Sequence, residues 1–236
     1  MEVVLIKNEL QAIGLMALAC RTCTGTVYTS KSTATDTTNF VKKVLKSGHE
    51  SIMEHVNFTF LIEGISRACS HQLVRYRHCS FSQLSQRYAK VGTEKEARNA
   101  HFNYFSGKPD EADEILAKYF VLPKEYPSRH EVARTFVGYH EAIARGVKPE
   151  EARALLPNCT KTNLLVTTNL RELVHICNER MCARAQGEIR ELIGKMRDLV
   201  LENLPELKEF LVPKCQKFGV CTEEKSCGMM PKMEER

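Results

Sequence analysis

Several common features are missing from this sequence, and each absence excludes a class of protein. There is no tryptophan, and no apolar run approaches the roughly 20 residues that a helix needs to span a bilayer. No Gly-x-Gly-x-x-Gly or Walker A glycine loop is present, which argues against a Rossmann or P-loop nucleotide site. The start, MEVVLIKNEL, lacks the basic segment, long apolar segment and cleavage site of a secretory signal. We therefore expect a cytoplasmic protein.

Carboxylates are missing from one long stretch. Residues 64–93 contain neither Asp nor Glu, although the 236-residue chain has 29 of them. The cationic side chains in the stretch are Arg67, Arg75, Arg77, Arg87 and Lys90. One interpretation is a helix surface that pairs with carboxylates from elsewhere in the fold. The other is an anion site, because arginine binds phosphate in bidentate fashion and hydroxyl groups complete the shell.

Amide and hydroxyl side chains accompany these arginines in the segment SFSQLSQR, residues 80–87. Gln83, Ser85 and Gln86 offer both donors and acceptors, which the edge of a nucleobase or of a flavin ring requires. The segment therefore predicts a nucleotide pocket. A basic RNA- or DNA-binding module is the alternative, although the net charge of +5 is small for that class.

Ten cysteines without a secretory signal indicate reduced thiols rather than a disulfide framework. Cys20 and Cys23 form a Cys-x-x-Cys pair, but no second pair follows at zinc-ribbon distance. In the tail, Cys215, Cys221 and Cys227 are evenly spaced. Three thiolates could hold a metal with one further ligand, yet this spacing is not a standard one. We assign no metal site.

The apolar pattern predicts an α+β fold in a single domain over residues 1–236, with a cysteine-containing tail at about 213–236. Strands are expected at 3–6, 56–62, 101–105 and 159–168. Helices are expected at 37–45 after an Asp36 N-cap, 65–75, 110–119, 128–145, 149–156 and from Asn169 to about Leu201. Long helices with non-adjacent strands indicate a central mixed β-sheet flanked by helices.

Two arginines fall on the apolar face of the last expected helix. At about 100° per residue, Arg180 and Arg184 share the sector of Cys177. A buried guanidinium needs an anionic or strongly polar partner, since unpaired burial costs several kcal/mol. Either a structural carboxylate, such as Glu54 or Glu151, or a bound anion would satisfy this need.

These residues resemble the flavin-dependent thymidylate synthase family, whose signature is Arg-His-Arg, seven residues, then Ser. Here it reads Arg75-Tyr76-Arg77, seven residues, then Ser85. Further segments resemble the family in the same order, namely residues 48–55 (GHESIMEH), 65–75 (ISRACSHQLVR), 151–173 and 179–192. Tyr76 replaces the signature histidine, which keeps an aromatic ring with a polar tip but loses the imidazole.

The resemblance implies reductive methylation of dUMP to dTMP. Methylenetetrahydrofolate would supply the carbon, and FAD reduced by NADPH would supply the hydride. The family also implies a homotetramer with active sites at subunit interfaces, and neither nucleic acid nor membrane as a partner. Because of Tyr76, a catalytically impaired flavin- or nucleotide-binding homologue is an alternative.

The family's site residues carry over to matching positions. Those expected to hold dUMP are Gln72, Arg75, Gln83, Leu84, Ser85, Gln86, Arg87, Arg153 and Arg180. Those expected to meet FAD are Ser51, Arg75, Tyr76, Arg77, Gln83, Asn169, Leu170, Arg171 and His175. His49 is expected near the flavin and the folate. His175 and Arg184 stand where some members carry asparagine and histidine.

Arg180 is the expected catalytic residue. Adding a methylene at uracil C5 requires an electron-rich ring, and an arginine facing the O2/N3 edge stabilises the charge that develops when N3 ionises. Ser85 is expected to position the substrate and not to act as a nucleophile, since no His–Asp partner is evident. Cys79 lies inside the signature, but the family does not use that position as a nucleophile.

Overall fold

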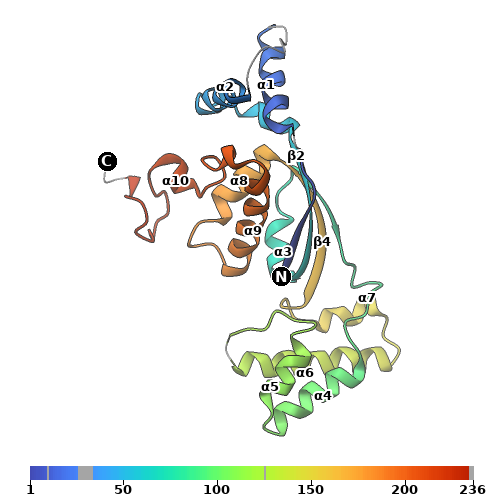
Figure 1. The fold of residues 1–236 in the computed structure, drawn as a ribbon. Helices are drawn as coiled ribbons and strands as arrows, with labels where there is room; N and C mark the ends of the chain where they lie inside the picture. Colours follow the sequence, from blue (N-terminus) through green and yellow to red (C-terminus); the bar gives the residue numbers. More distant parts are fainter. Residues whose placement is uncertain (10, 26–33, 125, 234–236) are drawn as a thin grey trace. The chain divides into compact units, whose positions relative to one another are not determined.

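The computed structural model describes residues 1–9, 11–25, 34–124 and 126–233 (Figure 1). Contacts divide the chain into two compact units. The first unit consists of Met1, Glu63–Gln72 and Ser82–Leu164, and the second of Glu2–Ile62, Leu73–Phe81 and Leu165–Arg236. The expectation of one domain stays a prediction.

Seventeen elements follow one another along the described chain. The first are β1 (Glu2–Lys7), α1 (Ala12–Cys23), α2 (Ala34–Lys46), the 3-10 helix η1 (Glu50–His55), β2 (Asn57–Ser66), α3 (Arg67–Leu73) and β3 (Cys79–Gln83). Next come α4 (Glu94–Phe105), α5 (Pro109–Leu116), α6 (Tyr126–Ala144), α7 (Pro149–Ala152), η2 (Arg153–Leu155) and β4 (Lys161–Asn169). The last are α8 (Leu170–Arg180), α9 (Gly187–Asn203), η3 (Pro205–Leu207) and α10 (Lys214–Phe218). Within the described segments, no helix combines the length and apolar character that crossing a membrane requires.

The strands form one sheet in the order β1-β2-β4-β3, which confirms the α+β class. β2 and β4 run antiparallel, as the 3.0 Å contact between the hydroxyls of Thr59 and Thr167 and the bond from Leu170 N to Val56 O illustrate. The expectation of a mixed sheet is wrong, because all four strands are antiparallel. Strand direction depends on which distant segments pair, and an apolar pattern does not encode that choice.

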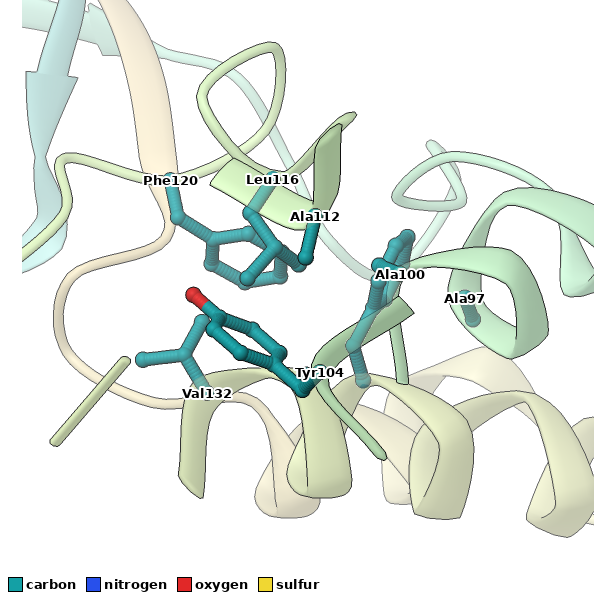
Figure 2. Packing of buried hydrophobic residues seen from close by; sticks show 9 residues of the cluster. Ala97, Ala100, Tyr104, Ala112, Leu116, Phe120 and Val132 are labelled. Atoms are coloured by element: carbon teal, nitrogen blue, oxygen red, sulfur yellow. The ribbon is translucent and has the colours of Figure 1, made fainter. Parts of the chain in front are cut away.

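In the first unit, α4, α5 and α6 pack around a hydrophobic core (Figure 2). Its buried members are Ala97, Ala100, Tyr104, Ala112, Leu116, Phe120, Val132, Ala133 and Phe136. The alanines of α4 and α5 allow close helix approach, and the rings of Phe120 and Phe136 meet edge to face at 5.1 Å. Gly92 has φ 55°, and a Cβ there would lie 2.7 Å from Phe136 Cζ, so this position requires glycine.

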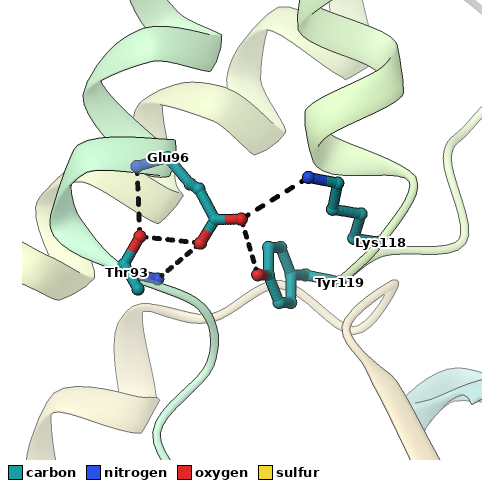
Figure 3. Close-up of polar contacts among 4 residues, drawn as sticks. All are labelled: Thr93, Glu96, Lys118 and Tyr119. Atoms are coloured by element: carbon teal, nitrogen blue, oxygen red, sulfur yellow. Dashed lines mark hydrogen bonds and ion pairs between the residues drawn. The ribbon is translucent and has the colours of Figure 1, made fainter.

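α4 begins with a capping box (Figure 3). Thr93 Oγ1 accepts a hydrogen bond from Glu96 N at 3.3 Å, and Glu96 Oε2 accepts one from Thr93 N at 3.1 Å. Tyr119 donates to Glu96 Oε1 at 2.8 Å, and Lys118 Nζ lies 3.6 Å from the same oxygen. The Thr93 and Tyr119 hydroxyls lower the pKa of Glu96. The strand expected at 101–105 is wrong, because this segment forms the end of α4. The Thr-x-x-Glu pattern at residues 93–96 was the local signal for a helix.

The long helix expected from Asn169 is two helices. Asn169 does cap α8, since its Oδ1 accepts from Glu172 N at 2.9 Å. α8 ends at Arg180, however, and α9 begins only at Gly187. Glycine has a low helix propensity, so it favours a break there.

Other boundaries are close to expectation. The helices expected at 65–75, 110–119, 128–145 and 149–156 and the strands expected at 3–6, 56–62 and 159–168 are confirmed, with ends that shift by a few residues. Asp36 lies inside the first turn of α2, so its assignment as the N-cap is wrong. β3 was not expected, because its polar sequence CSFSQ resembles a loop.

Candidate functional site

Arg75, Tyr76 and Arg77 of the signature lie in the turn between α3 and β3, and Ser85 follows β3. Arg75 and Arg77 are exposed, whereas Tyr76 between them is only 8% exposed. Tyr76 N donates to Leu73 O at 3.2 Å. The turn therefore buries the phenol and leaves both guanidinium groups at the surface.

Tyr76 holds Arg180 in the second unit. Nε of Arg180 donates to the Tyr76 hydroxyl at 2.9 Å, and its Cζ lies 5.6 Å from the centre of the ring. The ring of His175 meets Tyr76 edge-on, with centroids 5.6 Å apart. Burial raises the pKa of Tyr76, although Arg180 acts in the opposite direction. The phenol is therefore neutral, and Arg180 is held by a hydroxyl instead of a carboxylate.

A cavity of about 650 Å³ lies beside α8 in the second unit, and we call it the α8 cavity. Its lining residues are Glu50, Glu54, His78, Asn169, Arg171, Glu172, Val174, His175, Asn178, Glu179, Lys214, Lys217 and Phe218. Arg171 pairs with Glu54, and Lys217 Nζ lies 2.6 Å from Glu50 Oε1. The lining therefore combines hydrogen-bond donors, carboxylates and one aromatic ring.

The structure brings part of the expected FAD set to this cavity. Asn169, Arg171 and His175 line it. Ser51 lies in η1 between the lining residues Glu50 and Glu54, with an exposed side chain.

The other members of the FAD set lie outside the lining. Leu170 is fully buried, so its side chain belongs to the core. Arg75, Tyr76 and Arg77 occupy the signature turn, and Gln83 belongs to the first unit. His49 precedes η1 and is exposed.

A second polar pocket lies beside α7 in the first unit, with a volume of about 510 Å³, and we call it the α7 crevice. Its lining residues are Arg67, His71, Gln86, Glu150, Arg153, Ala154, Leu156, Pro157 and Asn158. Arg153 Nε donates to Glu150 O at 3.0 Å. Glu150 Oε2 accepts from Arg87 Nε at 2.8 Å. The crevice therefore offers two arginines and a histidine, and its single carboxylate already pairs with Arg87.

Arg67 is a member of the crevice that the sequence interpretation left out of the site. Its Nη2 donates to Leu84 O at 2.6 Å, while its buried Nε has no hydrogen-bond partner within the described part of the chain. Burial, and then Arg153, lower the pKa of this guanidinium. The sequence did contain a signal that Arg67 belongs to this pocket, because Arg67 lies in the acid-free stretch one helical turn before His71.

The expected dUMP set is distributed over both units. Gln86 and Arg153 line the α7 crevice. Gln83 Nε2 donates to Ser70 Oγ at 3.0 Å, and Ser85 Oγ accepts from Arg87 N at 3.3 Å.

Four further members of the dUMP set complete this distribution. Gln72 is half-buried on α3, and Leu84 is 46% exposed. Arg75 and Arg180 belong to the second unit.

Arg184 does not share a helix face with Arg180. It lies in the turns between α8 and α9, is exposed, and donates from Nη1 to Lys225 O at 3.0 Å. The shared apolar face expected for the two arginines is therefore wrong, and Arg180 itself is half-buried.

Cys79 is a half-buried thiol. Its Sγ donates to Thr168 Oγ1 at 3.3 Å, and burial raises its pKa to about 11. Because a thiol must ionise to become a good nucleophile, this environment is in keeping with the absence of a nucleophilic role.

The fold is that of thymidylate synthase X structures. A crystal structure of thymidylate synthase X from Helicobacter pylori with FAD and dUMP matches with a TM-score of 0.74 at 21% identity, covering 92% of this chain and 100% of that one. Another structure of the flavin-dependent enzyme from the same organism, complexed with FAD and dUMP, matches with a TM-score of 0.72 at 22% identity, covering 91% of this chain and 99% of that one.

Sequence relatives define the family. The model of the family described as thymidylate synthase complementing protein matches residues 4–206. A flavin-dependent thymidylate synthase from Pyrococcus furiosus is 39% identical over 200 residues, which is 80% of this chain and 74% of the relative. One from Geobacter sulfurreducens is 35% identical over 241 residues, which is 97% of this chain and 94% of the relative. The chain belongs to the flavin-dependent thymidylate synthase family, as the signature predicted.

Proposed function

We propose that this protein methylates dUMP reductively to dTMP, with methylenetetrahydrofolate as carbon donor and FAD reduced by NADPH as hydride source. The observation that supports this proposal is the family match over residues 4–206, which includes the signature turn, α7 and α8. The same segment contributes most of the lining of the α8 cavity and the whole lining of the α7 crevice.

In this proposal the α7 crevice receives the phosphate of dUMP. Arg153 and Arg67 provide cationic groups there, His71 provides an imidazole, and Gln86 adds an amide. Arginine forks match phosphate oxygens in bidentate geometry. The unsatisfied Nε of Arg67 supports the assignment, because a buried donor gains most from an arriving acceptor.

Arg180 is proposed to stabilise the uracil ring in its ionised form. Tyr76 accepts from Nε of Arg180, so the two terminal amino groups of the guanidinium are left for a ligand. Two donors in one plane match the O2/N3 edge of uracil. Because the phenol is neutral, the positive charge of Arg180 is not cancelled when substrate binds.

The α8 cavity is proposed to hold FAD. Its volume lies within the roughly 300–1,000 Å³ typical of cofactor pockets. Arg171 and His175 offer donors to phosphate or ring heteroatoms, and Phe218 offers a surface for stacking. When bound, reduced FAD supplies the hydride. The residues that line the cavity would orient it.

The remaining partners are proposals that rest on the family. They are NADPH and methylenetetrahydrofolate as co-substrates, with His49 near the folate, a homotetramer with active sites at subunit interfaces, and a cytoplasmic location. Ten cysteines outside any disulfide in the described residues support a reducing compartment. Light scattering of the purified protein tests the assembly, and a monomer at micromolar concentration would contradict the tetramer.

The decisive experiment measures tritium release from dUMP labelled at C5, with folate and NADPH present. We expect a yellow protein with flavin absorbance that releases tritium only when all components are added. A colourless protein that takes up no FAD would refute the proposal.

Tyr76 in the signature favours one second candidate, a flavin-binding homologue with impaired catalysis. A yellow protein that releases no tritium would support this candidate over the synthase. Restoring the signature in Tyr76→His would then recover turnover. Salt-sensitive binding to any nucleic acid sequence would instead favour the nucleic-acid-binding alternative.

A further inference from the structure

A second cavity of the second unit lies outside the site described above. Its volume is about 310 Å³, and its walls come from the turns after α8, from α10 and from the tail that follows α10. Four cysteines line it, namely Cys182, Cys215, Cys221 and Cys227. The other six cysteines of the chain do not line it. We call it the thiol cavity.

Cys182 lines the same cavity as the three evenly spaced cysteines of the C-terminal segment. Cys215, Cys221 and Cys227 follow one another at equal intervals, but three thiolates are one short of a four-cysteine site. Cys182 lies more than 30 positions upstream and reaches the same cavity because α8 ends at Arg180. The break between α8 and α9 thus places a fourth thiol with the other three.

Two side-chain hydrogen bonds stabilise the non-helical backbone between α8 and α9, where Cys182 lies. Arg190 Nη1 donates to Ala183 O at 2.8 Å, and Arg184 Nη1 donates to Lys225 O at 3.0 Å. The second bond ties the turns after α8 to the tail. The elements that carry the four thiols are therefore already connected.

The described residues after η3, up to position 233, have little regular structure. They contain α10, which is five residues long, and an isolated bridge between Cys221 and Lys232. Even so, Val220 and Cys221 are 8% and 6% exposed. Short segments with few backbone ladders are commonly held by a disulfide or a metal, and all four cysteines are free thiols here.

Charge around the thiol cavity suits thiolate ligands. Arg184, Arg190 and Lys214 line it, against the carboxylates of Glu179 and Glu223. A four-thiolate metal centre carries net negative charge, which cationic neighbours stabilise.

We propose that Cys182, Cys215, Cys221 and Cys227 form a metal centre with four thiolate ligands. A sulfur-only ligand set of this kind selects zinc or an iron–sulfur cluster. Each thiol loses its proton to solvent as its sulfur–metal bond forms. A divalent metal offsets two of the four negative charges, and Arg184, Arg190 and Lys214 stabilise the remaining charge. In the described residues, no three metal-ligating side chains are already arranged to hold an ion. Binding therefore draws the thiols inward and orders the tail, as is usual for sites that form with their metal.

The first test is the metal content of the full chain, purified without oxygen from medium supplemented with zinc and iron. We expect about one zinc per chain, or iron with equal acid-labile sulfide, and these two outcomes separate the two kinds of centre. Replacing any one of the four cysteines by serine lowers the metal content several-fold. The matched control is the double variant Cys20→Ser/Cys23→Ser in α1, which keeps the wild-type metal content.

The second test needs no variant, so a folding defect cannot obscure it. The native protein is alkylated before and after treatment with a chelator, and peptides are analysed by mass spectrometry. We expect labelling of the four cysteines to rise at least several-fold after chelation, while labelling of Cys23 stays constant. A wild-type protein that binds no metal, or equal labelling of all four thiols before and after chelation, would overturn the proposal.

Discussion

The α7 crevice and the Tyr76–Arg180 pair use arginine in opposite ways. Beside the crevice, Arg87 pairs with Glu150 at 2.8 Å, so the chain itself supplies a counter-charge. Arg180 donates to a neutral phenol, and within the described segments no carboxylate pairs with it. A paired guanidinium mainly fixes local structure, whereas one held by a hydroxyl keeps its charge for a ligand. We propose that this difference distinguishes a residue that binds substrate from one that acts in catalysis, and each residue can be tested separately.

The largest effect is expected at Arg180. Arg180→Ala should lower kcat about 10²- to 10³-fold, since it removes a charge aimed at the ionised uracil. Tritium release from C5-labelled dUMP measures this loss. Arg98→Ala is the control, because the pair of Arg98 with Glu94 on α4 is exposed. Turnover within a factor of two of wild type in Arg180→Ala would remove the catalytic assignment.

A binding effect of intermediate size is expected at the crevice. Arg153→Ala should raise the KM for dUMP about 10- to 100-fold, because one charge-assisted hydrogen bond to phosphate is lost. kcat should change little, since the phosphate does not react. Steady-state kinetics over a range of dUMP concentrations separate the two constants, with Arg145→Ala as the control. A fall in kcat at unchanged KM would place Arg153 outside the phosphate site.

A smaller effect is expected at Tyr76. Tyr76→Phe keeps the ring but leaves Arg180 without its acceptor, so turnover should fall by up to about tenfold. Tyr76→His supplies a ring nitrogen as acceptor and should stay closer to wild type. Turnover and an FAD titration of both variants measure these effects. Equal behaviour of Tyr76→Phe and wild type would show that the hydroxyl does not position Arg180.

The smallest effect is expected at the capping box of α4 (Figure 3), whose residues line neither the α8 cavity nor the α7 crevice. The folded pKa of Glu96 is lowered, so its stabilisation is present above the unfolded pKa of about 4.3 and is lost as pH falls through the folded pKa. Glu96→Gln should therefore cost about 1 kcal/mol at pH 7 and progressively less under acid conditions. Urea unfolding at several pH values measures this. Thr93→Ser, which keeps the cap, should retain the wild-type pH profile. A pH-independent cost of Glu96→Gln would contradict the assignment.

Local elements were largely predictable. The alternation of Phe58, Phe60 and Ile62 predicts β2, and the side chain of Asn169 predicts the start of α8. The failures have local causes too. The segment 101–105 has residues typical of a strand. It is helical because the capping box at Thr93 begins α4, which continues to Phe105. The break after Arg180 was missed because apolar residues continue with helical spacing on both sides of it.

The residues expected to bind dUMP and FAD come together only in part. Arg153 and Gln86 line one crevice, and Asn169, Arg171 and His175 line one cavity. Their roles toward dUMP and FAD stay predictions. The contributions of α10 were not predictable. Lys217 pairs with Glu50, and no pattern along the chain relates positions so far apart.

By itself, the sequence determined the family signature, the acid-free stretch and most helices and strands. These follow from side chains that are neighbours along the chain, where periodicity and capping operate. Only the tertiary structure decided which arginines pair with a carboxylate and which donate a hydrogen bond to a phenol. It also decided that Cys182 joins Cys215, Cys221 and Cys227 at one cavity. The physical reason is that ion pairs and ligand sets depend on distance in space, which packing decides after the local elements have formed.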